Sequence, residues 1–126
     1  MREFAKFQLD KGVLYVTYQS FDPTPSEFNE YLNTLEKYLR ELDSYIVIYD
    51  ASLTKFLSAE MRALQAKWIN ENKDMIGKKI KKMIFIIPSI PIRLILKTIL
   101  SFSPLPSPHE VVVSKSAAEV IARSMN

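Results

Sequence analysis

The sequence contains no cysteine, two glycines and a single histidine. Without cysteine the chain can form neither a disulfide nor a thiolate metal site, which excludes the disulfide-rich secreted proteins and the zinc ribbons. Gly12 and Gly77 are too few glycines for a phosphate-binding P-loop or a dinucleotide-binding fingerprint. One histidine and scattered carboxylates offer no metal-ligand spacing. We therefore expect no metal and no cofactor.

Long uninterrupted apolar runs are also missing. The N-terminal residues MREFAKFQLDKG lack the apolar run and cleavage site of a secretory signal, so we expect a cytoplasmic location. The most apolar region, residues 83–105, is interrupted by three prolines, Arg93 and Lys97, whereas a membrane-spanning helix needs about 20 apolar residues. A net charge of +3 is too small to indicate nucleic acid as a partner.

The chain has the size and composition of one globular domain, which we expect to span residues 1–126. It has 48% hydrophobic and 25% charged residues, within the usual range for such domains. Residues 4–9 and 13–18 are rich in β-forming types and are separated by Asp10-Lys11-Gly12. This pattern predicts a β-hairpin with glycine at the strained turn position.

Helix and strand signals alternate along the rest of the chain. Thr24, Pro25 and Glu27 carry a capping box with proline at the first helical position, which predicts a helix that runs to Leu42. Short apolar runs predict buried strands over residues 45–49, 82–87 and 109–113. Further helices are predicted from a Ser58 cap to about Gly77, over residues 92–102, and from a Ser116 cap to about Met125.

This alternation predicts the fold class. Strands that alternate with helices favour parallel pairing through right-handed crossovers, with helices covering the sheet. We therefore predict an α/β fold in which an N-terminal β-hairpin is followed by alternating α and β elements. The mixed sheet should have about five strands and be covered by about four helices.

The order of elements resembles the STAS domain of bacterial anti-sigma factor antagonists and, more loosely, the STAS/SEC14 group of SpoIIAA-like proteins. The antagonists carry an aspartate at the end of the central strand and a serine two residues later, and Asp50 and Ser52 match both. Where they have a phosphorylated Asp-Ser-Ser turn, this sequence has Ser58, Ala59 and Glu60. Ser58 would be the phosphate acceptor only in a register shifted by two residues. The resemblance therefore implies a regulatory, partner-binding domain without that phosphorylation switch.

Residues 85–113 also resemble a run found in uncharacterised bacterial proteins of this SpoIIAA-like group. The run contains the helix predicted over residues 92–102, which has apolar residues around most of its circumference. Packing on a sheet needs an apolar stripe of only about 100°. The surplus is either covered by the proline-rich loop that follows or forms a partner-binding, dimerising or lipid-facing patch. That patch would contain Leu96, Leu100 and Phe102, flanked by the positive charges of Arg93 and Lys97.

Lys78, Lys79, Lys81 and Lys82 form the densest run of charge. Such a run before a buried strand is usually a solvated segment that keeps the strand soluble. The alternative is contact with an acidic partner, an anionic lipid or a phosphate.

His109 could pair with Ser107 or a carboxylate such as Asp50, but it lies beside prolines at a strand entrance, so we do not expect an enzyme. We favour a non-enzymatic domain that docks a partner protein or a second copy of itself through the helices that begin near residues 58 and 92. The remaining candidate surface residues are Asp50, Ser52, Ser58, Glu60 and His109. The alternative is an apolar or lipidic ligand, or an anionic membrane surface, bound through the 92–102 region.

Overall fold

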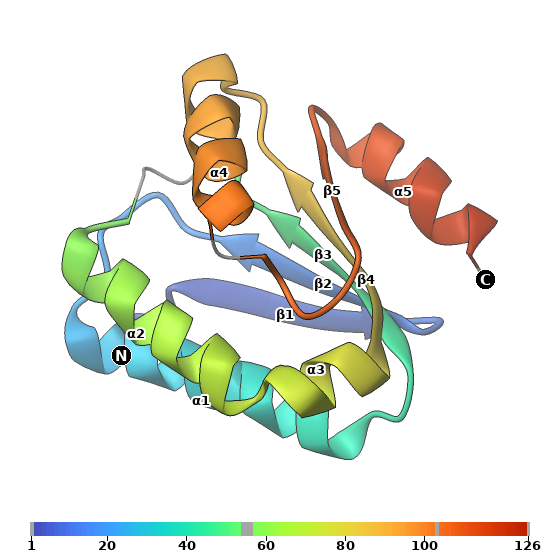
Figure 1. Ribbon diagram of the computed structural model, residues 1–126, viewed down its shortest axis with the longest axis horizontal. Helices are drawn as coiled ribbons and strands as arrows, with labels where there is room; N and C mark the ends of the chain where they lie inside the picture. Colours follow the sequence, from blue (N-terminus) through green and yellow to red (C-terminus); the bar gives the residue numbers. More distant parts are fainter. Residues whose placement is uncertain (1, 54–56, 103, 126) are drawn as a thin grey trace.

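A computed structural model of the chain describes residues 2–53, 57–102 and 104–125 (Figure 1). The strands are β1 (Ala5–Asp10), β2 (Val13–Tyr18), β3 (Tyr45–Asp50), β4 (Ile80–Ile86) and β5 (His109–Val112). The helices are α1 (Pro25–Glu41), α2 (Ala59–Glu71), α3 (Lys73–Lys79), α4 (Ile90–Phe102) and α5 (Lys115–Ser124). The predicted α/β class, the N-terminal hairpin and the five-stranded mixed sheet are confirmed.

The first two strands form the predicted hairpin. β1 pairs antiparallel with β2, and Asp10 lies opposite Val13, so Lys11 and Gly12 form a two-residue loop. Both loop residues have positive φ angles, +50° and +79°. This is the backbone of a type I′ turn, whose twist matches that of the two strands. Glycine at the second loop position adopts this conformation without a side-chain clash.

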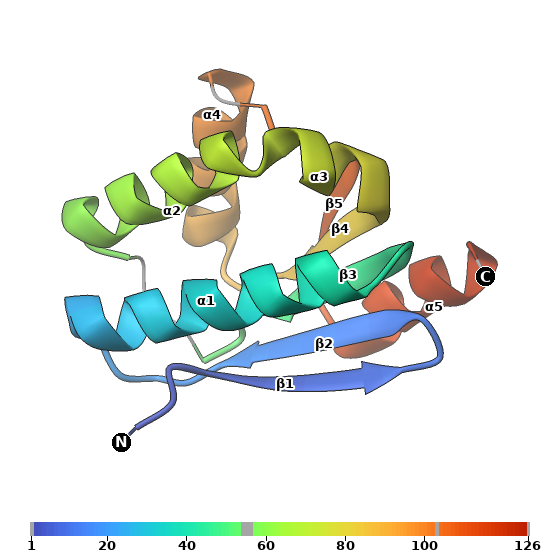
Figure 2. The same ribbon diagram turned by 90° about the horizontal axis from the view of Figure 1, so that it is seen from below.

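The order of the strands places most of the helices on one face of the sheet. The order is β1-β2-β3-β4-β5, and every pair after the first is parallel. Each crossover therefore moves one strand further in the same direction. Crossovers of one hand then place α1, the α2–α3 pair and α4 over the same face. The last helix, α5, has no further strand to reach and packs on the opposite face (Figures 1 and 2).

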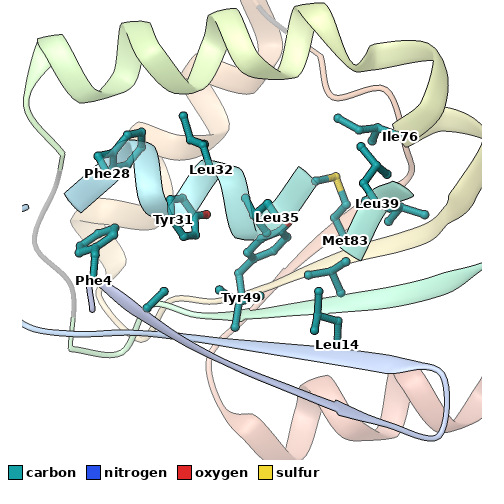
Figure 3. Close-up of a cluster of buried hydrophobic side chains, with 14 of the residues drawn as sticks. Phe4, Leu14, Phe28, Tyr31, Leu32, Leu35, Leu39, Tyr49, Ile76 and Met83 are labelled. Atoms are coloured by element: carbon teal, nitrogen blue, oxygen red, sulfur yellow. The ribbon is translucent and has the colours of Figure 1, made fainter. Parts of the chain in front are cut away.

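Side chains along the central strands point alternately to the two faces of the sheet, and each face has its own hydrophobic core. Leu14, Val16, Val47, Tyr49 and Met83 point toward α1, α2 and α3, where they meet a cluster that includes Phe28, Leu35, Leu39 and Ile76 (Figure 3). Their neighbours Val13, Ile46, Ile48, Ile84 and Ile86 pack against Ala118 and Ala122 of α5. Every residue of Tyr45–Tyr49 is buried, as expected for a central parallel strand.

Two of the four helix starts were predicted correctly, whereas α4 begins at Ile90, two residues before the predicted start, and the last helix also begins early. Thr24 and Glu27 form the reciprocal capping box, and Ser58 accepts a hydrogen bond from the Met61 N–H at 3.2 Å. The last helix, however, is capped by Ser114 rather than by Ser116, because the Ser114 hydroxyl accepts from the Ala117 N–H. The helix therefore begins as soon as β5 ends, two residues earlier than predicted.

The single helix predicted from Ser58 to about Gly77 is two helices. The backbone leaves helical geometry at Asn72, whose side-chain amide donates to the Trp68 carbonyl at 2.9 Å. Asparagine side chains compete in this way with the regular helical hydrogen bonds. Gly77 does not end the helix but lies inside α3, which continues to Lys79. This break accounts for the fifth helix.

Candidate binding cleft beside helix α4

Helix α4 is the least integrated element of the fold. It contains no buried residue, although most of its side chains are apolar. In Figure 1 it stands beside the arrowheads of β2, β3 and β4, at the carboxyl ends of the parallel strands. Ile90, Leu94 and Phe102 remain 63%, 60% and 83% exposed. A helix that only covered a sheet would bury its apolar stripe, so α4 has apolar surface that the fold does not use.

A cleft of about 1050 Å³ lies between α4 and the α2–α3 pair. Its floor is built from residues at or just beyond the carboxyl ends of the strands, including Tyr18, Ala51 and Ile87. One wall is the half-buried side of α4, formed by Ile92, Leu96, Ile99 and Leu100. The opposite wall is a row of small and polar residues on α2 and α3, namely Ala59, Ala63, Ala66, Asn70, Lys73 and Gly77. The small side chains of this row leave the cleft wide.

The proline-rich loop closes one end of the cleft, where Pro104, Leu105 and Pro106 line it. Two contacts hold this loop against α3. The buried Ser107 hydroxyl donates to the Ile76 carbonyl at 2.9 Å. A side chain at Gly77 would lie 3.3 Å from the Pro106 carbonyl oxygen, so glycine allows the close approach.

Charged residues gather on the α2–α3 side of the cleft. Arg62, Lys73 and Lys78 line it together with the single acid Asp74. Lys73 and Lys78 form no ion pair or hydrogen bond within residues 2–53, 57–102 and 104–125. The α2–α3 side of the cleft therefore combines an apolar interior with two lysines that form no ion pair among the described residues.

Three tyrosines under the cleft supply no basic group. The hydroxyls of Tyr18 and Tyr31 are hydrogen-bonded to each other, and the Tyr49 ring stacks on Phe85 with centroids 4.9 Å apart. Burial raises the pKa of all three phenols well above the usual value. They stay protonated at neutral pH and act as apolar packing with a local hydrogen bond.

Asp50 and Ser52 form a local turn rather than part of the cleft wall. The Asp50 carboxylate accepts from the Ser52 N–H at 3.0 Å and from the Ser52 hydroxyl at 2.6 Å. Ser58 is occupied as the cap of α2, and Glu60 is exposed in the first turn of that helix. Only the residues beside them, Ala51, Leu57 and Ala59, line the cleft. These four predicted residues therefore surround its α2 end without entering it.

His109 does not meet the groups that a catalytic role would need. It is exposed at the start of β5, where it pairs with Met83 and so lies level with Val47, three residues before Asp50. Ser107 directs its hydroxyl to the Ile76 carbonyl. Within the described residues, His109 has no hydrogen bond to Ser107, Asp50 or Ser52.

The four lysines of the basic run have four different surroundings. Lys79 caps the end of α1 by donating to the Leu39 and Arg40 carbonyls at 2.8 and 3.2 Å. Lys82 pairs with Glu110 at 2.8 Å. Lys78 lies at the cleft, and Lys81 is exposed on β4. The run is therefore split between α3 and β4, and contact of these lysines with an anion stays a prediction.

The described part of the chain contains no cluster of three or more His, Cys, Asp or Glu residues placed to hold a metal ion. None of its helices is both long enough and apolar enough to cross a membrane.

No protein-family model and no curated protein sequence matches the chain, but solved structures do. An uncharacterised DUF3478-family protein from Shewanella loihica PV-4, described as having a SpoIIAA-like fold, aligns with a TM-score of 0.71 and 14% identity. The alignment covers 94% of this chain and 91% of that one. The chain has a SpoIIAA-like, or STAS-like, fold.

A second structure with this STAS-like fold is an anti-sigma factor antagonist from Mycobacterium paratuberculosis. It aligns with a TM-score of 0.60 and 12% identity, over 94% of this chain and 92% of that one. The resemblance predicted from the order of elements, Asp50 and Ser52 is thus confirmed at the level of the fold.

Sequence reasoning singled out the surplus apolar residues of α4 but missed the cleft and its opposite wall. One signal for that wall was present. Ala59, Ala63 and Ala66 recur at intervals of four and three on α2, a spacing that places small residues on one side of a helix. A sequence cannot show, however, that a second helix will stand opposite that side.

Proposed function

We propose that the protein is a non-enzymatic regulatory module of the cytoplasm that binds a partner protein through the outer face of α4. This outer face consists of Ile90, Leu94, Ile95 and Phe102. The observation that carries the proposal is the exposure of these four large apolar side chains on one short helix, at 43% to 83% each. Folded monomers rarely leave such a patch open to water without a use for it.

The charges on α4 favour an acidic partner over a second copy of the chain. Lys97 is exposed, and Arg93 lies one turn before it on the same helix. Two copies that met through α4 would bring like charges together, which is unfavourable. A partner with an apolar segment and neighbouring carboxylates would match both the apolar residues and the charges.

The similarity to an anti-sigma factor antagonist supports a protein partner. That protein is named for acting against another protein factor, and it shares the fold at 12% identity. Such a role needs no catalytic group. The absence of a hydrogen bond between His109 and Ser107, Asp50 or Ser52 fits a module that works by contact.

Site-specific photo-crosslinking tests this proposal. A photoreactive amino acid is placed at Leu94 and, as the control, at Asn33, an exposed position on α1 away from the cleft. We expect one discrete protein adduct from position 94 and none from position 33. The captured protein, once purified, should bind the wild type and lose about tenfold affinity for a Leu94→Asp variant. Equal labelling from both positions, or undiminished affinity of the variant, would refute the proposed surface.

An anionic membrane surface is the second candidate for the outer face, because Lys97 lies on the same helix as the exposed apolar residues. Flotation with phosphatidylglycerol vesicles at low salt separates the two. Flotation that is lost in a Leu94→Asp variant would favour the membrane.

A further inference from the structure

The cleft on the inner side of α4 and its outer face are built from different residues of the helix, although a smaller pocket lined by Leu94, Ile95 and Ile99 lies between them. Its volume of about 1050 Å³ is just above the range of roughly 300–1,000 Å³ for small-molecule sites. Ile92, Leu96 and Ile99 face it, while Leu94 and Phe102 do not line it. A ligand in this cleft and a partner on the outer face could therefore be present together.

The lining requires a ligand with a long apolar part. Apolar side chains enter the cleft from every side, including Phe85 and Ile87 from the sheet, Ile69 from α2, Leu96 from α4 and Leu105 from the loop. Water in such a space has few polar partners, and its release by an apolar chain is favourable. An acyl chain along the cleft would also bury the half-buried apolar side chains of α4, which the protein itself leaves partly exposed.

The positive charges at the α3 wall favour a ligand whose other end is negatively charged. Lys73 and Lys78 lie at the two ends of α3, and neither is paired with a carboxylate in the part of the chain that the structure describes. Among the described residues that line the cleft, Asp74 is the only acid, against the two lysines. A negative head group would meet net positive charge at this wall, while burial of a charge deeper in the apolar interior would be costly.

We propose that the cleft binds a long-chain fatty acid. The chain lies between α2 and α4, and the carboxylate lies beside Lys73 and Lys78. This inference does not rest on the proposed docking of a partner protein, because it concerns the inner side of α4. Failure of crosslinking at Leu94 would leave it intact, and failure of fatty-acid binding would leave the outer face intact.

Calorimetric titration of the purified protein with oleate, below the concentration at which oleate forms micelles, tests the proposal. Oleyl alcohol has the same chain without the charge and serves as the matched ligand. Ala66→Phe fills the cleft from an exposed position on α2, and Asn33→Phe adds the same bulk on α1 outside it. Lys73→Glu/Lys78→Glu reverses the charges, and Lys67→Glu does so at an α2 position that does not line the cleft.

We expect saturable binding of one oleate per chain and weaker binding of oleyl alcohol. Ala66→Phe should abolish binding of both ligands, whereas Asn33→Phe should not. The double lysine reversal should weaken oleate binding about tenfold and leave oleyl alcohol nearly unchanged, because only the anionic head meets those side chains. Lys67→Glu should have little effect on either ligand.

A methyl NMR titration of the wild-type protein keeps the test independent of how the variants fold. Oleate should shift the methyl signals of Leu96 and Ile99 and leave those of Val120, on α5, in place. Absence of saturable binding, equal affinity for oleate and its alcohol, or unshifted Leu96 and Ile99 signals would each overturn the proposal. Binding to phosphatidylglycerol vesicles without binding of monomeric oleate would overturn it as well.

Discussion

Replacement of the outward apolar residues of α4 tests whether these side chains contribute to the stability of the fold. In Leu94→Gln/Phe102→Gln, both positions receive a residue whose helix propensity is close to that of leucine, so backbone effects stay small. Full burial of a Leu or Phe side chain contributes about 1.5–3 kcal/mol. Because Leu94 and Phe102 remain 60% and 83% exposed, the loss should be below about 1.5 kcal/mol for the pair.

Leu39→Ala provides the contrast. Leu39 is fully buried between α1 and the sheet, and such a truncation costs about 2–5 kcal/mol because it leaves a cavity. Urea unfolding followed by circular dichroism measures both free energies on the same scale. If the α4 double variant lost as much stability as Leu39→Ala, the outward residues would be enclosed by the same chain. The proposed docking surface would then have no basis.

Three further predictions concern the framework around the cleft. The Glu27 carboxylate accepts from the Arg2 Nε at 2.9 Å, and this ion pair together with the Thr24 hydrogen bonds lowers the pKa of Glu27 from 4.5 to about 2. The wild type should therefore be more stable than Glu27→Gln above pH 4.5, and this difference should disappear as the pH falls toward 2. Urea titrations across this range measure the difference, and a pH-independent difference would contradict the prediction. Ser107→Ala should cost about 0.5–1.5 kcal/mol in unfolding free energy, since it removes one hydrogen bond between the loop and α3 while the Ile76 carbonyl keeps its bond from the Ile80 N–H; a neutral result would mean that the loop is not anchored there. Ser58→Ala should lower the thermal midpoint, because loss of the helix cap costs about 1 kcal/mol of unfolding free energy. Ser58→Asp should leave the midpoint unchanged, because aspartate caps a helix equally well. Equal losses in the two variants would argue that Ser58 does not act as a cap.

Local signals account for what was predicted correctly. The hairpin turn, the capping box at Thr24 and the Ser58 cap each depend on residues within four positions of one another. The buried run Tyr45–Tyr49 identifies a central strand by itself. From these elements and their order the STAS-like fold follows, because alternating strands and helices with crossovers of one hand leave few arrangements.

The candidate site depended on contacts between distant parts of the chain. Gly77 of α3 lies close to the Pro106 carbonyl, and the Ser107 hydroxyl donates to the Ile76 carbonyl, 31 residues away in the sequence. Lys79, a member of the basic run, caps α1 by donating to the carbonyls of Leu39 and Arg40, which are 40 and 39 residues away in the sequence. No local pattern encodes such pairings, since each side chain could equally have remained in solvent.

The amino-acid sequence by itself determined the elements, their order and the surplus of apolar residues on α4, because these follow from neighbouring residues and their periodicity. The tertiary structure alone decided where that surplus lies. The four helices of the three crossovers share one face of the sheet, and α4, the last of them, stands at the strand ends with its inner stripe over a cleft and Leu94 and Phe102 facing solvent. The distinction between a ligand-binding side and a docking side exists only once α2 and α4 stand opposite each other.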